Sequence, residues 1–497
     1  MLLFSSIHLL IPEVRAATLI VCPAGPHTTV QAAIDSANPG DTINVWSGTY
    51  NERVTINKSI TLKGNGSTET IIDGQALGDA IQIKAPNVTI SGFMIRNSSE
   101  TDSGIFICGN SGYSVESCII ENNNLTENNI GLKIQNACNN IITQNTFLNN
   151  PIGISLIESY QNTIDNNSMT MISDHAAVIS GNYGIYLETS HNNSLSANNI
   201  SYYNVAIYGW FKSNSNIIDN NSIITNYNGI KFETSGYNLI INNKVNRNMG
   251  NGIGLYSTLN NELSCNEISY NGESGIYFFG ENTILNGNII NSNGGYGIHL
   301  VASISIFLSN NILDNNDIMI SGSILSSWNT HSIDISNSVN GEPIYYWANV
   351  TNNTIPERAG QIILANCKNI TVENQNISSL TAGIILGFSN SNIIRNNSFF
   401  ENYYGIYLYQ SDNNSIYDNQ ISRNNWGVYF DNSNNNTIDD NNIFIDNINK
   451  VYDEGFNNWL EEGDNGEFNY VITMVIILIV IISLIFVYVG VKRKTQK

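Results

Sequence analysis

Short runs in which hydrophobic and polar residues alternate recur along most of this chain. The unit "GIYL" that begins at Gly405 returns 22 residues later as "GVYF" at Gly427. Related units begin at Gly104, Gly131, Gly153, Gly184, Ala206, Gly229, Gly252, Gly275, Gly297 and Gly383. Within each unit the apolar residues stand two apart, as Ile406 and Leu408 do, and Ile, Val, Tyr and Phe dominate. This pattern predicts short β-strands.

Most units follow one another after 22 or 23 residues, which predicts a solenoid in which each repeat is one coil of the chain. A leucine-rich repeat would show regularly spaced leucines and a helical half, and neither is visible. A parallel β-solenoid remains, with about three strands per coil, ~4.8 Å between coils and ~17 coils in all. The register places six residues in its core: Ile253, Leu255, Ile276, Phe278, Ile406 and Leu408.

Asparagine is unusually frequent, with about 85 residues in the chain. A corner between strands requires residues that tolerate the left-handed backbone region, and Asn does so better than other non-glycine residues. When the same corner repeats, Asn side chains can stack as hydrogen-bonded ladders. A disordered Asn-rich tract is the alternative, but the periodic Ile, Leu and Val positions supply a core that such tracts lack.

Both ends of the chain carry targeting signals. Residues 1–17 resemble a secretory signal peptide, although they lack an early Lys or Arg. Residues 471–491 form an uncharged apolar run that is long enough to span a bilayer as one transmembrane helix. Residues 451–470 before it are an acidic juxtamembrane linker, and the basic residues 492–497 follow it. By the positive-inside rule, this single-pass protein has a cytoplasmic C-terminus and an extracytoplasmic solenoid.

Between these signals the sequence divides into four parts. Residues 18–63 form an N-terminal cap and the first coils, and the cap contains a short helix begun by Thr28 or Thr29. The apolar face of that helix is Val30, Ala33, Ile34 and Ala37. Repeats follow over 64–320 and 381–450. Residues 321–380 between them read as coils with an inserted excursion around 336–360.

Two stretches resemble known families. "TVQAAIDSANPGDTINVWSGTYNERVTI" is similar to the entry segment of right-handed parallel β-helix proteins of the pectin-lyase-like group. The coils of type "GIYL…NN.I..N.I..N" resemble the repeats of NosD-like proteins and of carbohydrate-binding and sugar-hydrolase (CASH) modules, and the whole is similar to archaeal surface β-helix proteins. The resemblance covers roughly residues 20–450 and implies an all-β, right-handed, single-stranded parallel β-helix. Fold alone does not determine function here.

Catalytic and metal-binding motifs are difficult to find in this sequence. The "GHG" of polygalacturonases, the "DPHD" of epimerases and the calcium clusters of pectate lyases are all missing. The best candidate catalytic pair is Asp174 and His175, in an insertion between Gly153 and Gly184, with His191 on a nearby corner; a solvated loop histidine is the simpler interpretation. We therefore expect no catalytic residues, and the sequence favours a protein that is not an enzyme.

The net charge and the distribution of metal-binding residues limit which partners and metal ions the protein is expected to bind. The net charge of −21 argues against nucleic acid. It permits Ca²⁺ binding, but no motif supports it. A copper site, suggested by the NosD resemblance, requires clustered His, Met or Cys, and the six His and seven Met are scattered. We expect no cofactor and no metal.

Aromatic residues occupy the outward positions of the "GIxLy" strands. The candidate glycan-binding residues at x and y are Tyr186, Tyr208, Trp210, Tyr256, Tyr277, Phe279, Tyr407 and Tyr409. Flat rings suit the apolar faces of sugars, and the nearby Glu188 and Glu233 suit hydroxyl groups. The structural alternative is that Tyr simply favours exposed strands. The sequence thus predicts a noncatalytic, membrane-anchored surface protein that binds glycans or builds the envelope. A polysaccharide-active lyase or hydrolase is the alternative, and a NosD-like metal accessory protein is a minor one.

Overall fold

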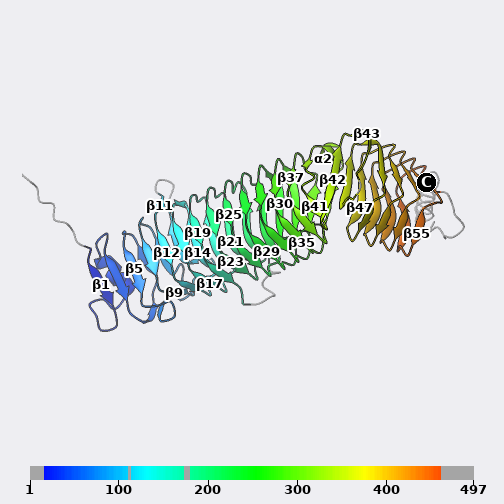
Figure 1. The fold of residues 1–497 in the computed structure, drawn as a ribbon. Coiled ribbons are helices and arrows are strands. Elements are labelled where there is room, and N and C mark those ends of the chain that lie inside the picture. The colour runs from blue at the N-terminus through cyan, green and yellow to red at the C-terminus, as the bar shows by residue number, and fades with distance from the viewer. Residues whose placement is uncertain (1–15, 110–113, 173–179, 357, 461–497) are drawn as a thin grey trace, which may run out of the picture.

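The computed structural model describes residues 16–109, 114–172, 180–356 and 358–460. It is a right-handed parallel β-helix in which successive coils stack into a long rod (Figure 1). The rod consists of two consecutive blocks, one drawn in blue to green and a second in yellow to orange. The predicted all-β solenoid is therefore confirmed over the described residues. The predicted signal peptide (apart from its last two residues), transmembrane helix and cytoplasmic tail lie outside them.

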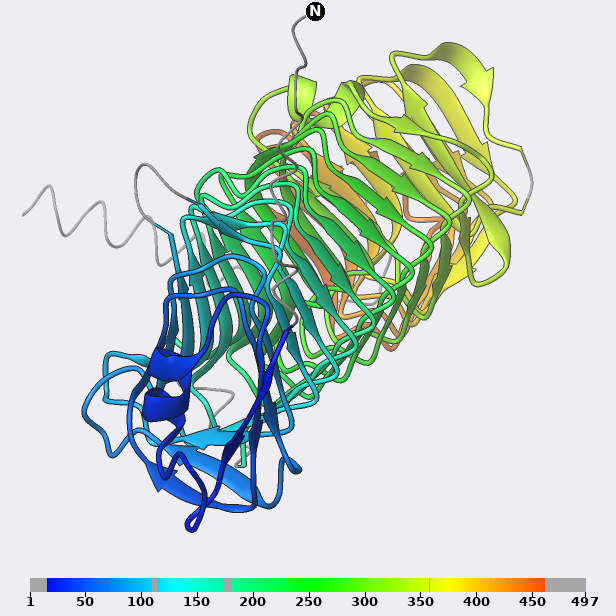
Figure 2. The ribbon, with the colours of Figure 1, turned by 90° about the vertical axis from the view of Figure 1, so that its left-hand side faces the viewer.

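A short helix covers the first coil. The helix α1 (Val30–Ser36) lies at the blue end of the rod, beside β1 (Thr18–Val21) (Figure 2). The Thr29 hydroxyl accepts the N–H of Ala32 at 3.2 Å, which is an N-cap. On the buried face of the helix, Val30, Ala33 and Ile34 are 0% exposed. The predicted cap is thus present with its predicted apolar face.

The first block has three parallel sheets. The first sheet contains, in spatial order, β1, β2 (Thr42–Val45), β5 (Thr61–Gly64), β8 (Thr89–Ser91), β12 (Ile119–Glu121), β16 (Ile141–Thr143), β19 (Thr163–Asp165), β22 (Ser194–Ser196), β25 (Ile217–Asp219), β28 (Leu239–Ile241), β31 (Glu262–Ser264), β34 (Ile284–Asn286), β37 (Phe307–Ser309) and β40 (Ser332–Ile333). The second contains β3 (Gly48–Asn51), β6 (Thr70–Asp73), β9 (Met94–Arg96), β13 (Asn124–Thr126), β17 (Thr146–Leu148), β20 (Ser168–Thr170), β23 (Asn199–Ser201), β26 (Ser222–Ile224), β29 (Lys244–Asn246), β32 (Glu267–Ser269), β35 (Ile289–Asn291), β38 (Ile312–Asp314) and β41 (Ser338–Val339). The third, built from the glycine-containing strands, contains β4 (Val54–Ile56), β7 (Ile81–Ile83), β10 (Ser103–Cys108), β14 (Ile130–Gln135), β18 (Ile152–Ile157), β21 (Tyr183–Glu188), β24 (Val205–Trp210), β27 (Asn228–Glu233), β30 (Ile253–Leu259), β33 (Ile276–Glu281), β36 (Ile298–Val301) and β39 (Ile318–Ser321). A small pair, β11 (Val115–Glu116) and β15 (Ala137–Cys138), lies at one corner.

The second block repeats this arrangement. Its glycine-containing sheet contains β42 (Glu342–Ala348), β44 (Gln361–Ala365), β47 (Ala382–Gly387), β50 (Tyr404–Tyr409), β53 (Trp426–Asp431) and β56 (Asn449–Asp453). The other two contain β43 (Thr351–Thr354), β45 (Lys368–Glu373), β48 (Ile393–Arg395), β51 (Ser415–Tyr417), β54 (Thr437–Ile438) and β57 (Trp459–Leu460), and β46 (Asn376–Ser378), β49 (Ser398–Phe400), β52 (Gln420–Ser422) and β55 (Ile443–Ile445). The first sheet of the first block has 14 strands, and the sheet of the second block from β43 to β57 has six. Since each coil adds one strand to such a sheet, the rod has more coils than the ~17 predicted.

The junction between the blocks is a reversal of strand direction. β41 pairs antiparallel with β42 through a turn at Gly341, whose φ is 84°, and the other strand pairs among the described residues are parallel. The helix α2 (Ser326–Asn329) lies beside this turn, and its Trp328 stacks on Tyr409 of the second block at 5.4 Å. The residues of the excursion expected around 336–360 include β41, the turn at Gly341 and the first two strands of the second block, β42 and β43.

The core follows the predicted register. Ile253, Leu255, Ile276, Phe278, Ile406 and Leu408 are all 0% exposed. At the corners, the two asparagines of each pair have different roles: one forms the exposed turn and the other is a buried hydrogen-bonding residue. Asn242 is exposed and left-handed, with φ of 55°, whereas Asn243 is fully buried and accepts the backbone N–H of Asn221 on the preceding coil at 3.0 Å. The predicted amide ladders therefore exist, and they satisfy backbone groups at the buried corners.

No helix among the described residues is long and apolar enough to cross a membrane. The predicted membrane span at 471–491 lies beyond the last described residue, and it remains a prediction.

Candidate functional site

The glycine of each "GIxLy" strand determines which residues face outward. A Cβ on Gly229 would lie 2.5 Å from the Cγ1 atom of Val245, and one on Gly252 would lie 2.7 Å from the Cγ2 atom of Ile268. The glycine position thus points into the core, as does the Ile that follows it. Because two successive residues face inward, the residue before the glycine faces outward, beside position x.

This geometry creates a continuous series of rings on the third sheet of the first block. We call this surface the aromatic face: Tyr183, Tyr186, Tyr208, Tyr256, Tyr277, Tyr296 and His299. Their centroids lie 5.3 Å apart for Tyr183–Tyr186, 5.8 Å for Tyr186–Tyr208, 5.0 Å for Tyr256–Tyr277, 5.5 Å for Tyr277–His299 and 4.4 Å for Tyr296–His299. The Tyr208 and Tyr256 rings do not touch each other. Lys231 lies between them, with its Nζ 5.3 Å from the Tyr208 ring and 5.2 Å from the Tyr256 ring. The face therefore runs unbroken from β21 to β36.

Carboxylates hold the phenol groups in place. The Tyr186 hydroxyl donates to Glu188 at 3.1 Å, and the Tyr208 hydroxyl donates to Glu233 at 3.1 Å. Glu233 also forms an ion pair with Lys231 at 2.5 Å. Burial, reinforced by Glu233, raises the pKa of Tyr208 above its usual value. These side chains present fixed oxygen atoms between flat rings.

Burial also shifts the pKa values of Tyr256 and His299. It raises the pKa of Tyr256 to about 12 and lowers the pKa of His299 to about 4. His299 Nε2 lies 3.0 Å from the Ser321 hydroxyl, which fixes the ring. At neutral pH the His299 imidazole and the Tyr256 phenol are therefore uncharged.

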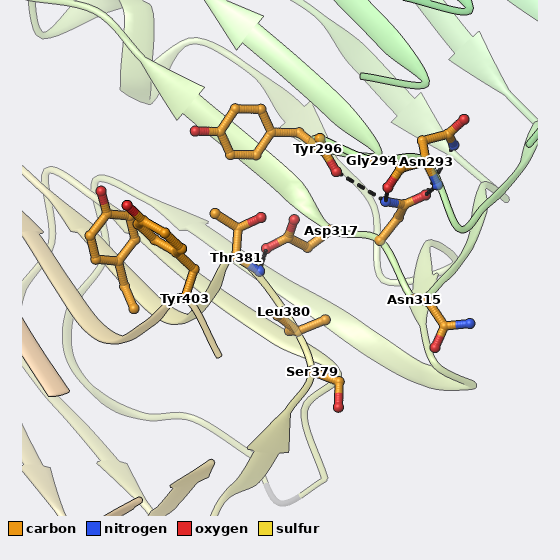
Figure 3. A pocket seen from close by; sticks show the side chains of 12 residues that line it. Asn293, Gly294, Tyr296, Asn315, Asp317, Ser379, Leu380, Thr381 and Tyr403 are labelled. Carbon is orange, nitrogen blue, oxygen red and sulfur yellow. Dashed lines mark hydrogen bonds between the residues drawn. The ribbon is translucent and has the colours of Figure 1, made fainter. Parts of the chain in front are cut away.

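A cleft of about 510 Å³ opens where the aromatic face meets the second block (Figure 3). Tyr296 and Asp317 line it from the first block, and Thr381, Tyr403 and Tyr404 line it from the second. Figure 3 shows Asp317 between Tyr296 and Thr381, with Tyr403 beyond.

Asp317 joins the two blocks at the floor of the cleft. Its Oδ2 accepts the backbone N–H groups of Thr381 at 2.9 Å and Ala382 at 3.1 Å. The buried Gln361 reinforces the junction, because its amide exchanges hydrogen bonds with the backbone of Ile318 at 3.0 and 2.8 Å. Burial raises the pKa of Asp317 to about 6, although the backbone donors oppose this shift. The carboxyl therefore has a structural task that its surroundings explain.

The structure places the eight predicted aromatic residues in three groups. Tyr186, Tyr208, Tyr256 and Tyr277 belong to the aromatic face. Trp210 and Phe279, 39% and 40% exposed, lie at position y beside it. Tyr407 occupies the same position x in the second block, but neighbouring rings cover it: it is 8% exposed between the Tyr404 and Tyr429 rings and donates to Asp431 at 2.9 Å. Tyr409 is half-buried against Trp328, so it belongs to the junction.

Sequence reasoning missed the aromatic residues that stand directly before the glycine. Tyr183, Tyr296 and Tyr404 occupy this place, and the first two complete the aromatic face. The signal was present as an aromatic residue preceding "GIxL", but it has meaning only once the glycine is known to point inward. Asp174 and His175 lie outside the described residues. His191 stacks on Tyr160 at 6.5 Å, away from the aromatic face.

Most of the chain matches one protein family. Residues 34–236 and 335–476 match the family described as "Periplasmic copper-binding protein (NosD)". The chain belongs to the NosD family. Residues 170–318 also match the right-handed β-helix region. A cell surface glycoprotein of Methanothermus fervidus is 40% identical over 101 residues, which are 20% of this chain and only 15% of that relative.

Solved structures of similar shape include an epimerase module and a protein bound to xylose. The Azotobacter vinelandii mannuronan C-5 epimerase AlgE4 A-module is 14% identical, covers 87% of this chain and 95% of its own, and has a TM-score of 0.32. The complex of XylC with xylose is 11% identical, covers 62% and 86%, and has a TM-score of 0.45.

Proposed function

We propose that this NosD-family protein is a noncatalytic glycan-binding protein of the cell envelope, and that the aromatic face is its binding surface. The observation that carries the proposal is the series of ring contacts from β21 to β36, joined by Lys231 between Tyr208 and Tyr256, which ends at the cleft. Isolated exposed tyrosines are ordinary on strands. A line of rings from five of six successive coils, with Lys231 on the remaining coil and carboxylates between, instead forms an extended platform for a polymer.

The platform suits sugar rings by shape and by chemistry. Each stacked sugar contributes about 1 kcal/mol by analogy with other aromatic contacts. Glu188 and Glu233 offer acceptors for hydroxyl groups between the rings. Because one polymer chain engages several coils at once, weak contacts add up to useful affinity.

The envelope location is proposed on three grounds. The family is described as periplasmic, the M. fervidus relative is a cell surface glycoprotein, and the sequence predicts a secretory signal and a membrane span at 471–491. The predicted anchor would hold the β-helix outside a lipid bilayer, with residues 492–497 inside. Protease added to intact cells is expected to remove the β-helix and leave a small membrane fragment. Protection of the β-helix would reverse this orientation.

Retention on immobilised envelope polysaccharides tests the binding function. The variant Tyr208→Ala/Tyr256→Ala/Tyr277→Ala removes the middle of the face, and is expected to weaken retention roughly 100-fold if each ring contributes about 1 kcal/mol. The control is Tyr237→Ala/Tyr270→Ala, which removes two tyrosines that are 61% and 57% exposed and lie outside the aromatic face. If both variants bind like wild type, the face is structural only.

A polysaccharide-cleaving enzyme is the second candidate, and the cleft is where it would be sought. Among the described residues that line the cleft, Asp317 is the one carboxyl group, and backbone N–H donors occupy it. Acid–base cleavage of a glycosidic bond ordinarily requires two carboxyl groups. The same polysaccharide panel, assayed for release of reducing ends or unsaturated products, is expected to show none. Cleavage would replace the proposed function.

A copper site is the minor alternative that the family description raises. The described residues contain no group of three or more His, Cys, Asp or Glu side chains that could hold a metal ion. Of the described histidines, His331 is buried against the Ser327 carbonyl and His299 is fixed by Ser321. The described part of the chain does not fit the donor set that copper prefers.

A further inference from the structure

We propose that the glycan bound by the aromatic face is uncharged, and that the face rejects polyanions such as uronate polymers. This inference rests on the proposed function and adds the chemical class of the ligand. It follows from the sign and the neutralisation of the charges that border the face.

Carboxylates dominate the border. Glu188 and Glu233 lie on the outward positions of β21 and β27, hydrogen-bonded to the face's own tyrosines. Glu273 lies beside Tyr256 and accepts the Asn251 amide at 2.8 Å. Asp317 adds a fourth acidic group at the floor of the cleft.

The one cation among these side chains is already neutralised. Lys231 lies between the Tyr208 and Tyr256 rings, and its Nζ is 2.5 Å from Glu233. His299 does not add a second charge, because burial lowers its pKa to about 4. No Lys or Arg is found among the described residues that line the cleft. A carboxylate-bearing sugar would therefore find no unpaired cation along the described face.

The cleft offers the groups that an uncharged sugar needs. Its described lining combines the amides of Asn293 and Asn315, the hydroxyl of Thr381 and the rings of Tyr296 and Tyr403. Amides and hydroxyls pair with sugar hydroxyl groups, and the two rings supply apolar area. A polymer of uronates would instead bring one negative charge per sugar against the carboxylates, and like-charge contacts at an interface are strongly unfavourable.

The test compares neutral and anionic polysaccharides on the whole protein. Mannan and a β-glucan serve as neutral polymers, alginate and polygalacturonate as anionic ones, and retention is measured at low salt and at ~0.5 M NaCl, where surface charges are screened. We expect retention by at least one neutral polymer, changed less than about twofold by salt, and at least about tenfold weaker retention by both anionic polymers at low salt. Equal or stronger retention by the anionic polymers overturns the inference and leaves glycan binding intact. Retention by none of a broader envelope panel overturns the proposed function itself.

A charge variant locates the rejection. Glu188→Gln/Glu233→Gln releases Lys231 and removes two negative charges from the face, and is expected to raise retention by alginate at low salt by about tenfold. Glu121→Gln/Glu262→Gln changes the net charge equally on the first sheet, away from the face. An equal rise in both variants would show that the net charge of the molecule causes the rejection, and would overturn its assignment to the face.

Discussion

Replacing Asn243 by Ala examines the buried amide ladder at a single rung. Asn243 is fully buried, and its Oδ1 accepts both the backbone N–H and the side-chain amide of Asn221, each at 3.0 Å. Its own amide donates to the carbonyls of Ile218 and Ile241 at 2.8 Å and to the Oδ1 of Asn266 at 3.0 Å. One side chain thus links three consecutive coils.

The cost follows from the groups that lose their partners. The Asn221 N–H would remain buried without an acceptor, at about 2 kcal/mol, and the vacated amide volume adds about 1 kcal/mol. Because each coil of a solenoid contacts only its neighbours, the loss of about 3 kcal/mol should be local.

Amide hydrogen exchange resolves such a local loss. In Asn243→Ala, the amides of β25, β28 and β31 are expected to exchange about 100-fold faster, which corresponds to about 3 kcal/mol, while β50 and β53 are unchanged. The matched control is Asn242→Gly at the adjacent exposed corner, where φ of 55° suits glycine and the expected cost is below about 0.5 kcal/mol. Equal protection in both variants would refute the assignment of the ladder to the buried asparagines.

Three further variants test the core, the junction and a buried histidine. Ile406→Asp places an unpaired charge in the core and is expected to cost several kcal/mol, read as a lower thermal unfolding temperature; an unchanged temperature contradicts the register. Gly387→Ala places a Cβ 2.1 Å from Cε3 of Trp328 and is expected to change tryptophan fluorescence, whereas an unchanged spectrum argues against this packing. For His299, burial lowers the folded pKa from 6.5 to about 4, so the unfolded chain takes up the proton first. Its contribution to stability is present above about pH 6.5 and is lost as pH falls towards 4, by as much as about 3 kcal/mol; urea unfolding of His299→Gln should lack this loss, and an identical pH profile would contradict it.

The repeat made the coil predictable from sequence, because each strand sees the same neighbours on every turn. Ile253 and Leu255 needed only alternation to be placed in the core, and Thr29 needed only its position before an apolar helical face. Because such local signals recur in every coil, a wrong prediction for one coil can be corrected from the pattern of the others.

The binding face and the cleft depend on contacts that no period reveals. Tyr183 and Tyr296 face outward because the following glycine packs inward against another coil, which is a tertiary effect. The cleft lies where the described chain reverses, at Gly341, and where Thr381 meets Asp317 across 64 residues. A single turn of this kind leaves no periodic trace in the sequence.

Hydroxyl-radical footprinting of tyrosine side chains, with and without a bound neutral polysaccharide, tests the glycan-binding claim most directly. We predict that Tyr186, Tyr208, Tyr256 and Tyr277 are protected together when the polymer is bound, while the exposed Tyr237 and Tyr270 keep their reactivity. Protection of Tyr237 and Tyr270, with the aromatic face as reactive as in the free protein, would contradict this prediction.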